Sequence, residues 1–447
     1  MSDFQVAYIP IGVPTFHLES AKKQFDDSIE LLYNLTENLA SPEEMLLSID
    51  KLNDYLKTIN PDLIVLQNIT FANSQYASEV LAKFPSVPIL LWTLREPVID
   101  GGRLRLNSLT GAYSAANVIK KIKGGIFEYT YGGPKEDKVI KKLKSTIEAA
   151  KVKKSLTSSR IASIGHTPEG FGFGRPMDVD LLKHFGIRHT AIEARELIDK
   201  AKTYTDEECK EYLEDAKRRT VGLENTPPEN VLDFARLYKA YKDFVDENNI
   251  CAISSRCWPD FFTSFGTPVC AVLGILNDLG VAASCETDTY GALSMHIAMQ
   301  LSKNAVFFGD PVSLNEEENS ISFWHCGMAA CSLAREDTGA QIGEHCNRHI
   351  GPTMEFGLKP AKEVTVFRVG IDENGEFRFL IYEGEALDKP KQFIGTSMVV
   401  KTKNNASDII NKTVGEGWEP HFVVAYKNIA DELEILGNML NVAVERI

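Results

Sequence analysis

Short apolar runs alternate with longer segments of helical periodicity along the first third of the chain. The apolar runs predict strands at residues 6–9, 63–66 and 89–92. Between the first two, Phe25, Ile29 and Leu32 recur at helical spacing and predict a helix with one buried face. Strands separated by helices are typical of a parallel sheet that helices cover on both faces. We therefore predict a doubly wound, Rossmann-like domain over residues 1–152.

The same alternation returns further along the chain. A Gly-Gly-Pro break at 132–134 precedes a Lys-rich segment, which we interpret as a solvated helix that links two domains. Apolar runs at 160–164, 250–253, 281–284 and 305–308 then predict four strands with helices between them. These features predict a second Rossmann-like domain over residues 153–312.

From about residue 320 the pattern changes to β-branched and aromatic segments separated by turns. The segments are SISFWHC, EVTVFRV, EFRFLIYEG and HFVVAY, and Asn374-Gly375 is one of the turns. Short turns between such segments indicate antiparallel pairing. We predict a mainly β, barrel-like domain over residues 313–447, closed by the helical segment ADELEILGNMLNVAV. The predicted fold class is α/β, with two Rossmann-like domains followed by this antiparallel domain.

Composition restricts the partners of such a chain. The formal net charge of −14 argues against binding to nucleic acid or an anionic membrane, because phosphate groups require clustered Lys and Arg. No apolar run reaches the roughly 18 residues that a membrane helix needs, and the first residues lack the basic and apolar segments of a signal peptide. The eight cysteines lack the paired spacing of a zinc ribbon. We expect a cytoplasmic protein that acts on a small molecule.

Two acidic residues follow predicted strands directly. Glu286 follows the run GVAASC and Asp310 ends the run NAVFFG. If the two strands are parallel neighbours, both carboxylates lie at the sheet edge where α/β proteins bind ligands. A lone acid at such a position is more often a helix cap or a turn former, and Asp288 is the expected cap of the next helix. Glu286, however, interrupts an apolar context, where an unpaired charge is costly without a cation.

Two histidines lie beside aromatic β segments, His325 in ISFWHCG and His421 in GWEPHFVVAY. An imidazole in such a place either makes a hydrogen bond within the core or binds a metal, and for a lone histidine the first role is the commoner one. Two carboxylates with one imidazole suit Mn²⁺, Mg²⁺ or Co²⁺ better than a structural Zn²⁺. The residues alone therefore leave both roles open.

Other polar segments have two interpretations each. Arg105 and Asn107 follow a predicted strand, where they bind sugar hydroxyls or cap the helix that begins near Leu109. Arg348 and His349, in EHCNRH, suit either a substrate contact or a solvated turn. The Gly-rich segment GHTPEGFGFGRP lacks the glycine order and the downstream acidic residue of a dinucleotide site, so we expect a mobile loop over a site instead.

Several segments together resemble the L-fucose isomerase and L-arabinose isomerase superfamily. They are, in order, LLWTLREPVIDGGRLRLNSLTG, RCWPDF, CAVLGILNDLGVAASCETDTYGALS, FFGDP, WHCG and PHFVV, and they span nearly the whole chain. In that family a Glu, an Asp or Glu and a late His bind Mn²⁺, and the matching positions are Glu286, Asp310 and His421. His325 resembles the additional histidine of the arabinose branch, which implies either a metal ligand or a substrate contact.

The resemblance implies a metal-dependent aldose–ketose isomerase. The metal would stabilise the charge that develops on an open-chain sugar, while Glu286 and Asp310 transfer a proton between neighbouring carbons. Family members assemble as hexamers with sites at subunit boundaries, which implies a homo-oligomer here, a hexamer or a trimer. The implied sugar-binding residues are Asn107, Arg105, Arg256, Trp258, His325, Arg348 and His349.

This chain is short for either named enzyme and resembles a compact branch of the superfamily. That branch is similar to isomerases of other sugars, including sulfoquinovose, a 6-sulfonated glucose. Arg175, Arg335, Arg348 and His349 would then supply the cations for a sulfonate. Two alternatives from other classes are a sugar-binding protein or sensor without catalysis and a nicotinamide-dependent oxidoreductase. The missing dinucleotide motif argues against the second alternative.

Overall fold

The computed structural model describes residues 4–122 and 127–447, which divide into two units. Unit 1 comprises Met1–Ser155 and Ile435–Asn441, and unit 2 comprises Leu156–Glu434 and Val442–Ile447. The predicted boundary at residue 152 is close to the end of the first segment, whereas the boundary at 312 lies inside unit 2. The three-domain division therefore stays a prediction.

Unit 1 contains a parallel sheet with helices on both faces, as predicted. Its strands run in the order β2-β1-β3-β4-β5 and all pair in parallel. The strands are β1 (Val6–Ile11), β2 (Leu39–Ala40), β3 (Leu63–Asn68), β4 (Ile89–Thr93) and β5 (Glu128–Tyr131). The helices are α1 (Leu18–Leu35), α2 (Ile49–Leu56), α3 (Ser74–Lys83), α4 (Ser108–Ile122) and α5 (Asp137–Leu156).

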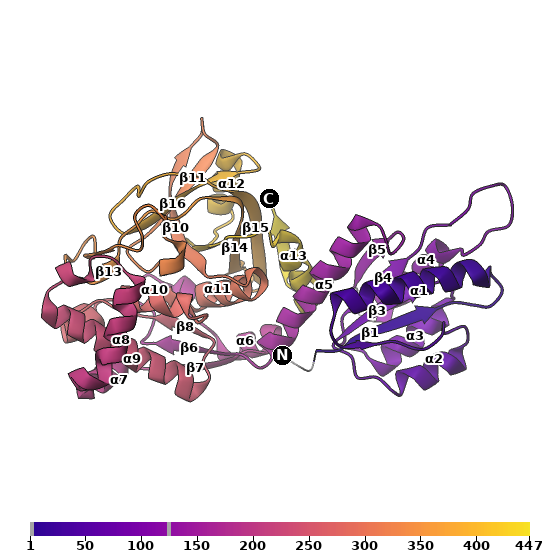
Figure 1. Cartoon of the computed structure of the whole chain (residues 1–447), viewed down its shortest axis with the longest axis horizontal. Coiled ribbons are helices and arrows are strands. Elements are labelled where there is room, and N and C mark those ends of the chain that lie inside the picture. Colours follow the sequence, from indigo (N-terminus) through magenta and orange to yellow (C-terminus); the bar gives the residue numbers. More distant parts are fainter. Residues whose placement is uncertain (1–3, 123–126) are drawn as a thin grey trace. The chain divides into compact units, whose positions relative to one another are not determined.

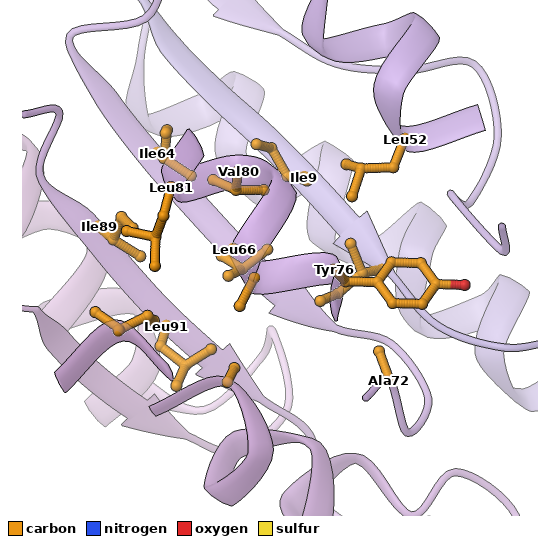
Figure 2. Close-up of a cluster of buried hydrophobic side chains, with 14 of the residues drawn as sticks. Ile9, Leu52, Ile64, Leu66, Ala72, Tyr76, Val80, Leu81, Ile89 and Leu91 are labelled. Carbon is orange, nitrogen blue, oxygen red and sulfur yellow. The ribbon is translucent and has the colours of Figure 1, made fainter. Parts of the chain in front are cut away.

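Alternating residues of each strand in unit 1 enter two different cores, because successive side chains of a strand point to opposite faces. Ile64 and Leu66 of β3 pack with α2, α3 and α4 on one face, as Figure 2 shows for part of this cluster. Leu63 and Val65 of the same strand pack with α1 and α5 on the other face. Both faces are therefore apolar, which explains why the strands appear in the sequence as uninterrupted hydrophobic runs.

The prediction that the Lys-rich segment forms a solvated linker helix is only partly right, because one face of this helix, α5, is buried. Val139, Leu143 and Ile147 are buried in the second core of unit 1, while Lys141 and Lys144 remain exposed. The apolar residues recur every four positions and form one buried face. The abundance of lysine concealed this stripe in the sequence.

Unit 2 begins with a second parallel sheet, of order β7-β6-β8-β9. Its strands are β6 (Arg160–Ile164), β7 (Arg188–Ile192), β8 (Ala252–Ser255) and β9 (Ala282–Cys285). The helices of this part are α6 (Asp178–Phe185), α7 (Ala194–Thr203), α8 (Asp206–Arg219), α9 (Pro228–Asn248), α10 (Cys270–Asp278) and α11 (Thr289–Ser302). Short helical turns occur at η1 (Gly172–Gly174), η2 (Leu223–Asn225), η3 (Phe261–Phe265) and η4 (Cys331–Leu333).

The rest of unit 2 is a closed antiparallel barrel of six strands, in the order β14-β17-β10-β11-β16-β15, closed by pairing of β14 with β15. The barrel strands are β10 (Val306–Asn315), β11 (Ser320–His325), β14 (Ala361–Ile371), β15 (Phe377–Ala386), β16 (Thr396–Thr402) and β17 (Phe422–Ala425). Additional elements are β12 (Ile342–Gly343), β13 (Thr353–Met354), β18 (Ala443–Arg446), α12 (Ala406–Gly415) and α13 (Ala430–Leu440). The prediction of a barrel-like region is confirmed.

Helix α11 joins the two parts of unit 2. It contacts the parallel strands β6, β8 and β9 as well as the barrel strands β10, β14 and β17. Figure 1 shows α11 between the barrel and the parallel sheet. Nearly all of its side chains are buried, because the helix is covered from both sides. The start of this helix is therefore a point where sheet and barrel meet.

The prediction that residues 305–308 belong to the parallel sheet is wrong. These residues open β10, which continues to Asn315 and pairs antiparallel with β11 and β17. Pro311 lies inside this strand, and a register shift between Pro311 and Ser313 accommodates the residue that has no N–H to donate. Asp310 and Glu286 therefore do not lie on one sheet, although both belong to unit 2.

Among residues 4–122 and 127–447, every helix is too short or too polar to span a lipid bilayer.

Candidate metal and sugar site

Glu286 lies in a strained turn between β9 and α11. Its φ angle is 58°, and that of Thr287 is 51°. Two consecutive left-handed residues with side chains cost roughly 1 kcal/mol or more each, so the surrounding structure must hold them. Gly174 packs against this turn so closely that a Cβ atom there would lie 2.7 Å from Cα of Asp288. Gly174, the last glycine of the segment GFGFG, is thus needed for close packing on this turn, whereas a Cβ atom at Gly170 or Gly172 would meet no atom within 4 Å.

Asp310 and His421 come from neighbouring strands of the barrel. Asp310 lies in β10, and His421 directly precedes β17, whose first residue pairs with Gly309. The Oδ1 atom of Asp310 is 3.4 Å from Nε2 of His421. The Oε2 atom of Glu286 is 3.2 Å from the same nitrogen. The structure therefore brings together the three residues that the resemblance implied as metal ligands.

Asp288 holds the other nitrogen of His421. Its Oδ2 atom accepts a hydrogen bond from Nδ1 of His421 at 2.9 Å, and its Oδ1 atom caps α11 by accepting from the backbone N–H of Gly291. Arg368 donates to both oxygens of Asp288, at 2.6 and 3.1 Å, and both of these residues are fully buried. A neutral His421 that donates from Nδ1 keeps the lone pair of Nε2 free for a ligand. The expected capping role of Asp288 is confirmed, and its contact with His421 is additional.

The electrostatics of this cluster favour a positive charge at Nε2 of His421. Burial alone lowers the pKa of His421, but hydrogen bonds to Asp288 and Glu286 and the charge of Asp310 raise it to about 10. Burial raises the pKa of Asp310, and the charge of Glu286 adds to this effect against the influence of the histidines. Arg368 and His421 hold the pKa of Asp288 low in spite of its burial. The negative cluster therefore stabilises a cation.

The donor set fits a hard divalent ion. Two carboxylate oxygens lie 3.2 and 3.4 Å from one imidazole nitrogen. Adjacent ligands of an octahedral ion with bonds of about 2.1 Å are about 3.0 Å apart. Each carboxylate–imidazole distance is close to this value, whereas the carboxylates of Glu286 and Asp310 must approach each other to share one ion. Carboxylate oxygen with imidazole nitrogen, and no thiolate among these three residues, suits Mn²⁺, Mg²⁺ or Co²⁺.

His325 lies beside this cluster at the end of β11. Its ring centroid is 5.8 Å from that of His421 and 5.7 Å from that of Phe308. Its Nδ1 atom accepts a hydrogen bond from the backbone N–H of Cys326 at 3.0 Å. In the neutral ring the proton then lies on Nε2, which favours a hydrogen-bond donor over a metal ligand. The role of His325 itself stays a prediction.

A series of aromatic contacts leads from His421 to other predicted residues. The ring of Phe173 is 5.7 Å from His421, and Phe171 is 5.6 Å from Phe173 and 6.4 Å from Trp258. The guanidinium group of Arg348 lies over the Trp258 ring at 5.3 Å. Thus the loop GHTPEGFGFGRP lies beside the site, and sequence reasoning missed its two phenylalanines. Their alternation with glycine in GFGFG was the available signal.

The predicted arginines differ in how far their charge is already neutralised. Nε of Arg256 is 2.8 Å from Asp260, and the side chain is largely buried. Arg335 forms ion pairs with Asp337 and Asp388, which argues against the prediction that it supplies a cation for a sulfonate. Of these two, neither offers an unpaired positive charge.

Arg348 is different. Its guanidinium lies over the rings of Trp258 and Phe262, at 5.3 and 5.0 Å, and it has no carboxylate partner within the described part of the chain. His349, the next residue, is exposed and has a φ angle of 54°. Arg175 is also exposed, directly after η1. Arg348 is therefore the candidate for binding an incoming anion, because two aromatic rings hold its guanidinium group and no described carboxylate neutralises it.

Arg105 and Asn107 belong to unit 1, whereas the other predicted site residues belong to unit 2. The carboxylate of Glu96 accepts hydrogen bonds from the backbone N–H groups of both, at 2.5 and 3.0 Å, and so orders their loop. Asn107 directly precedes α4, and its Oδ1 atom accepts from the hydroxyl of Thr110 at 2.7 Å. This contact suits the capping interpretation, and the role of both residues in sugar binding stays a prediction.

Comparison with known proteins identifies the family of the chain. The L-fucose isomerase C-terminal domain family matches residues 325–447. A sulfoquinovose isomerase from Clostridium sp. (strain MSTE9) is 57% identical over 445 residues, which cover 100% of this chain and 99% of the relative. The chain belongs to the sulfoquinovose isomerase family. The predicted resemblance to L-fucose isomerase-like enzymes is thereby confirmed.

More distant members of the sulfoquinovose isomerase family align over the same length. The enzyme from Alkalicoccus urumqiensis is 37% identical over 99% of both chains. The enzyme from Priestia megaterium (strain ATCC 12872 / QMB1551) is 36% identical over 99% of this chain and 98% of its own. Membership in this family makes the protein an aldose–ketose isomerase that acts on a sugar.

In this member of the sulfoquinovose isomerase family, the sequence prediction missed the charged residues behind His421. Arg368 is fully buried inside β14, and its Nε atom is 4.0 Å from Oε2 of Glu419. The other oxygen of Glu419 accepts from the backbone N–H of Ile371 at 2.8 Å. A signal was present, since an arginine in the apolar strand EVTVFRVG requires a buried partner.

Proposed function

We propose that the protein interconverts sulfoquinovose and its ketose by an enediol route that requires a divalent metal ion, Mn²⁺ with Mg²⁺ or Co²⁺ as alternatives. The observation that carries the proposal is the convergence of Glu286 and Asp310 on Nε2 of His421, at 3.2 and 3.4 Å. The full-length relatives named sulfoquinovose isomerase support the choice of sugar. Catalysis by these relatives also argues against the alternative of a sugar sensor.

Glu286, Asp310 and His421 would hold the ion, with Asp288 keeping the His421 ring in place through its 2.9 Å hydrogen bond. When bound, such an ion polarises the oxygens of the open-chain sugar and stabilises the negative charge that develops there. Glu286 follows the parallel strand β9, Asp310 lies in the barrel strand β10 and His421 directly precedes the barrel strand β17. The site would therefore require both parts of unit 2 to be folded.

The carboxylates of Glu286 and Asp310 each have a second oxygen. One carboxylate would remove the proton from one sugar carbon, and the proton would return to the neighbouring carbon. His325 would donate a hydrogen bond from Nε2 to a sugar oxygen, because its Nδ1 atom already accepts from the Cys326 backbone. The aromatic rings of Phe173, Phe171 and Trp258 would limit the access of water on this side.

Arg348 is the proposed partner of the sulfonate. The rings of Trp258 and Phe262 fix its guanidinium group, and the described residues give it no carboxylate, so its charge is available. A planar guanidinium can form two parallel hydrogen bonds to two oxygens of one anionic group. Arg335, paired with Asp337 and Asp388, provides the control arginine.

The experiment combines isotope labelling with two arginine variants. Metal-depleted protein is incubated with sulfoquinovose in deuterated water, with and without Mn²⁺. Ketose should form only with Mn²⁺, and deuterium should appear at C2 of the sugar after reversal. Ketose without label would overturn the enediol route, because direct hydride transfer between the carbons exchanges nothing with water. Activity that persists without any metal would overturn the metal requirement.

Substrate choice is tested by comparing sulfoquinovose with glucose. Arg348→Ala should raise KM for sulfoquinovose by roughly tenfold to a hundredfold, the range of one or two charge-assisted hydrogen bonds. It should leave unchanged the rate measured with glucose, which has no sulfonate, and Arg335→Ala should leave the rates with both sugars unchanged. An equal loss for both sugars would show that Arg348 supports the fold and not the sulfonate contact.

The resemblance also supports a homo-oligomer, and we propose a hexamer or a trimer. Light scattering of the purified protein, coupled to size exclusion, measures the mass directly. A monomer would contradict this part of the proposal and leave the proposed chemistry unaffected. The cytoplasmic location stays a prediction.

A further inference from the structure

Three cysteine side chains converge behind the site. The sulfur atoms of Cys270, Cys285 and Cys326 all lie within 4.8 Å of one another. Cys270 and Cys285 are fully buried, and Cys326 is 8% exposed. A fourth buried thiol, that of Cys257, contacts Cys285. All eight cysteines of the chain are free of disulfides.

The three thiols of the cluster come from three different elements, which distinguishes them from an isolated buried cysteine. Cys270 is the first residue of α10, Cys285 is the last residue of β9, and Cys326 directly follows β11. Buried cysteines usually act as isolated small hydrophobic groups, as Cys209 does in α8. Here three different elements of unit 2 each place a metal-ligating sulfur atom in one cluster.

The spacing agrees with coordination of one ion. Three thiolates bound to Zn²⁺ at about 2.3 Å stand about 3.8 to 4.0 Å apart, for tetrahedral or trigonal geometry. Separations within 4.8 Å therefore require only small side-chain movements. Cys257 provides a fourth sulfur next to the cluster, and a closed tetrahedral site uses four ligands.

We infer that Cys270, Cys285 and Cys326, with Cys257 beside them, form a second cation site, one for a soft ion such as Zn²⁺. Each thiol releases its proton to solvent as its sulfur–metal bond forms, and no electron is transferred. Thiolates prefer soft ions, whereas the carboxylates of Glu286 and Asp310 prefer hard ones. The two sites thus select different metals, and this inference does not depend on the proposed substrate.

Two cysteines of the thiol cluster are neighbours in sequence of residues in the proposed sugar site. Cys285 contributes to the thiol cluster and the next residue, Glu286, contacts His421. In the same way, Cys326 belongs to the thiol cluster and the preceding residue, His325, lies beside His421. An ion at the thiols would therefore tie the end of β9 to the end of β11, directly behind the proposed sugar site.

The test uses full-length, reduced protein that has been stripped of metal and then given excess Mn²⁺ to occupy the carboxylate site. Cd²⁺, a soft analogue of Zn²⁺, is titrated in, and the near-ultraviolet absorption of cadmium–thiolate bonds is recorded together with the bound metal per chain. Wild type should show this absorption with one tightly bound Cd²⁺ per chain. Cys270→Ala should lose it, whereas Cys209→Ala, which removes another buried helical thiol, should retain it.

Absence of the absorption in wild type, or equal absorption in Cys270→Ala, would overturn the inference. If the Cys270→Ala variant does not fold, a second measurement, which needs only the wild-type protein, still tests the inference. X-ray absorption of the protein loaded with one equivalent of Zn²⁺ should show three or four sulfur neighbours at about 2.3 Å. Oxygen and nitrogen neighbours alone would overturn the inference. Neither readout depends on isomerase activity, so failure here is distinguishable from failure of the proposed function.

Discussion

The chain contains two parallel sheets of similar construction, whose carboxyl ends carry charged residues with different partners. Arg95, which follows β4 of unit 1, forms an ion pair with Glu136 of the same unit at 2.7 Å, whereas the charged residue that follows β9 of unit 2 contacts the barrel. In unit 1, β3 and β4 end in Asn68 and Thr93, both uncharged and fully buried. In unit 2, β9 is followed by Glu286, whose carboxylate contacts His421 of the barrel. The carboxyl edge of a parallel sheet thus offers a place for ligands, but the chemistry depends on which residues lie there.

The barrel explains the difference between the two sheets. In unit 2 it supplies His421 and Asp310, which face the carboxylate at the sheet edge, and Arg368, which anchors Asp288. We therefore expect the unit 2 edge to carry catalysis. The unit 1 edge, with Arg105 and Asn107 nearby, should contribute at most to binding. Three experiments test this division, and a fourth compares the acid stability of the two units.

The largest effect is expected from Glu286→Gln, because the proposal gives Glu286 two roles, as a metal ligand and as a proton acceptor. The turnover number should fall by roughly a thousandfold or more, because general acid–base catalysis alone contributes about 10² to 10⁴. Steady-state kinetics and bound Mn²⁺ per chain are the measurements. Glu317→Gln, an exposed carboxylate in the turn between β10 and β11, is the control. Activity within tenfold of wild type would break the assignment of catalysis to this edge.

Asp288→Asn should have the next largest effect. Loss of the charge that orients His421 should weaken Mn²⁺ binding by roughly 10- to 100-fold. The variant also leaves Arg368 buried without its partner, which should destabilise the fold by about 3 kcal/mol or more. The double variant Asp288→Asn/Arg368→Met should recover thermal stability and leave metal binding weak. Recovery of both would show that Asp288 has only a structural role.

Acid should destabilise unit 2 through His296, which is buried in α11 with its Nε2 atom 3.3 Å from the Ser159 hydroxyl. Burial lowers its pKa from 6.5 to about 4. Between these values the unfolded chain binds a proton that the folded protein excludes, so stability is lost as the pH falls through this window. The loss at pH 5 is about 2 kcal/mol.

His296→Gln should remove this part of the pH dependence. The measurement is the free energy of unfolding of wild type and variant in urea, at pH 7 and pH 5. Unit 1 has a single histidine, His17, which is not buried, so it should contribute little to this difference. An equal loss of stability on acidification in both proteins would contradict the assignment to His296.

The smallest effect is expected in unit 1. Asn107→Ala should raise KM by about three- to tenfold and leave the turnover number unchanged, as expected for a residue that binds ground state and transition state equally. Asn73→Ala, which removes the cap of α3 in the same unit, controls for loss of stability. A fall in turnover number of more than tenfold for Asn107→Ala would show that the unit 1 edge takes part in the chemistry.

Most elements of the fold could be predicted from the sequence because their patterns are local. The hydrophobic runs of β1, β3 and β4 and the turn at Asn374-Gly375 are examples. The placement of β10 could not be predicted from its own residues. An apolar run of four residues fits a parallel or an antiparallel strand equally well, and only the partners β11 and β17 decide between them.

Some residues of the candidate site could be predicted from the sequence and others could not. The resemblance implied Glu286, Asp310 and His421, and the structure brings them together. The contact between Asp288 and His421 joins residues 133 positions apart in sequence, so no spacing rule could indicate it. The sequence prediction argued against a thiolate site, because the cysteines lack the short paired spacing of a zinc ribbon; the structure nevertheless brings Cys270, Cys285 and Cys326 together.

The position of β17 in the barrel has a consequence for biosynthesis. This strand lies between β10 and β14, although it is made after both of them, and it directly follows His421. A ribosome must therefore release residue 425 before the ring of strands can close. The segment Ile435–Asn441 completes unit 1 even later, through contacts such as that of Asn438 with Glu128. A nascent chain truncated before residue 425 should lack a closed barrel in unit 2 and the last segment of unit 1, and should therefore depend on chaperones.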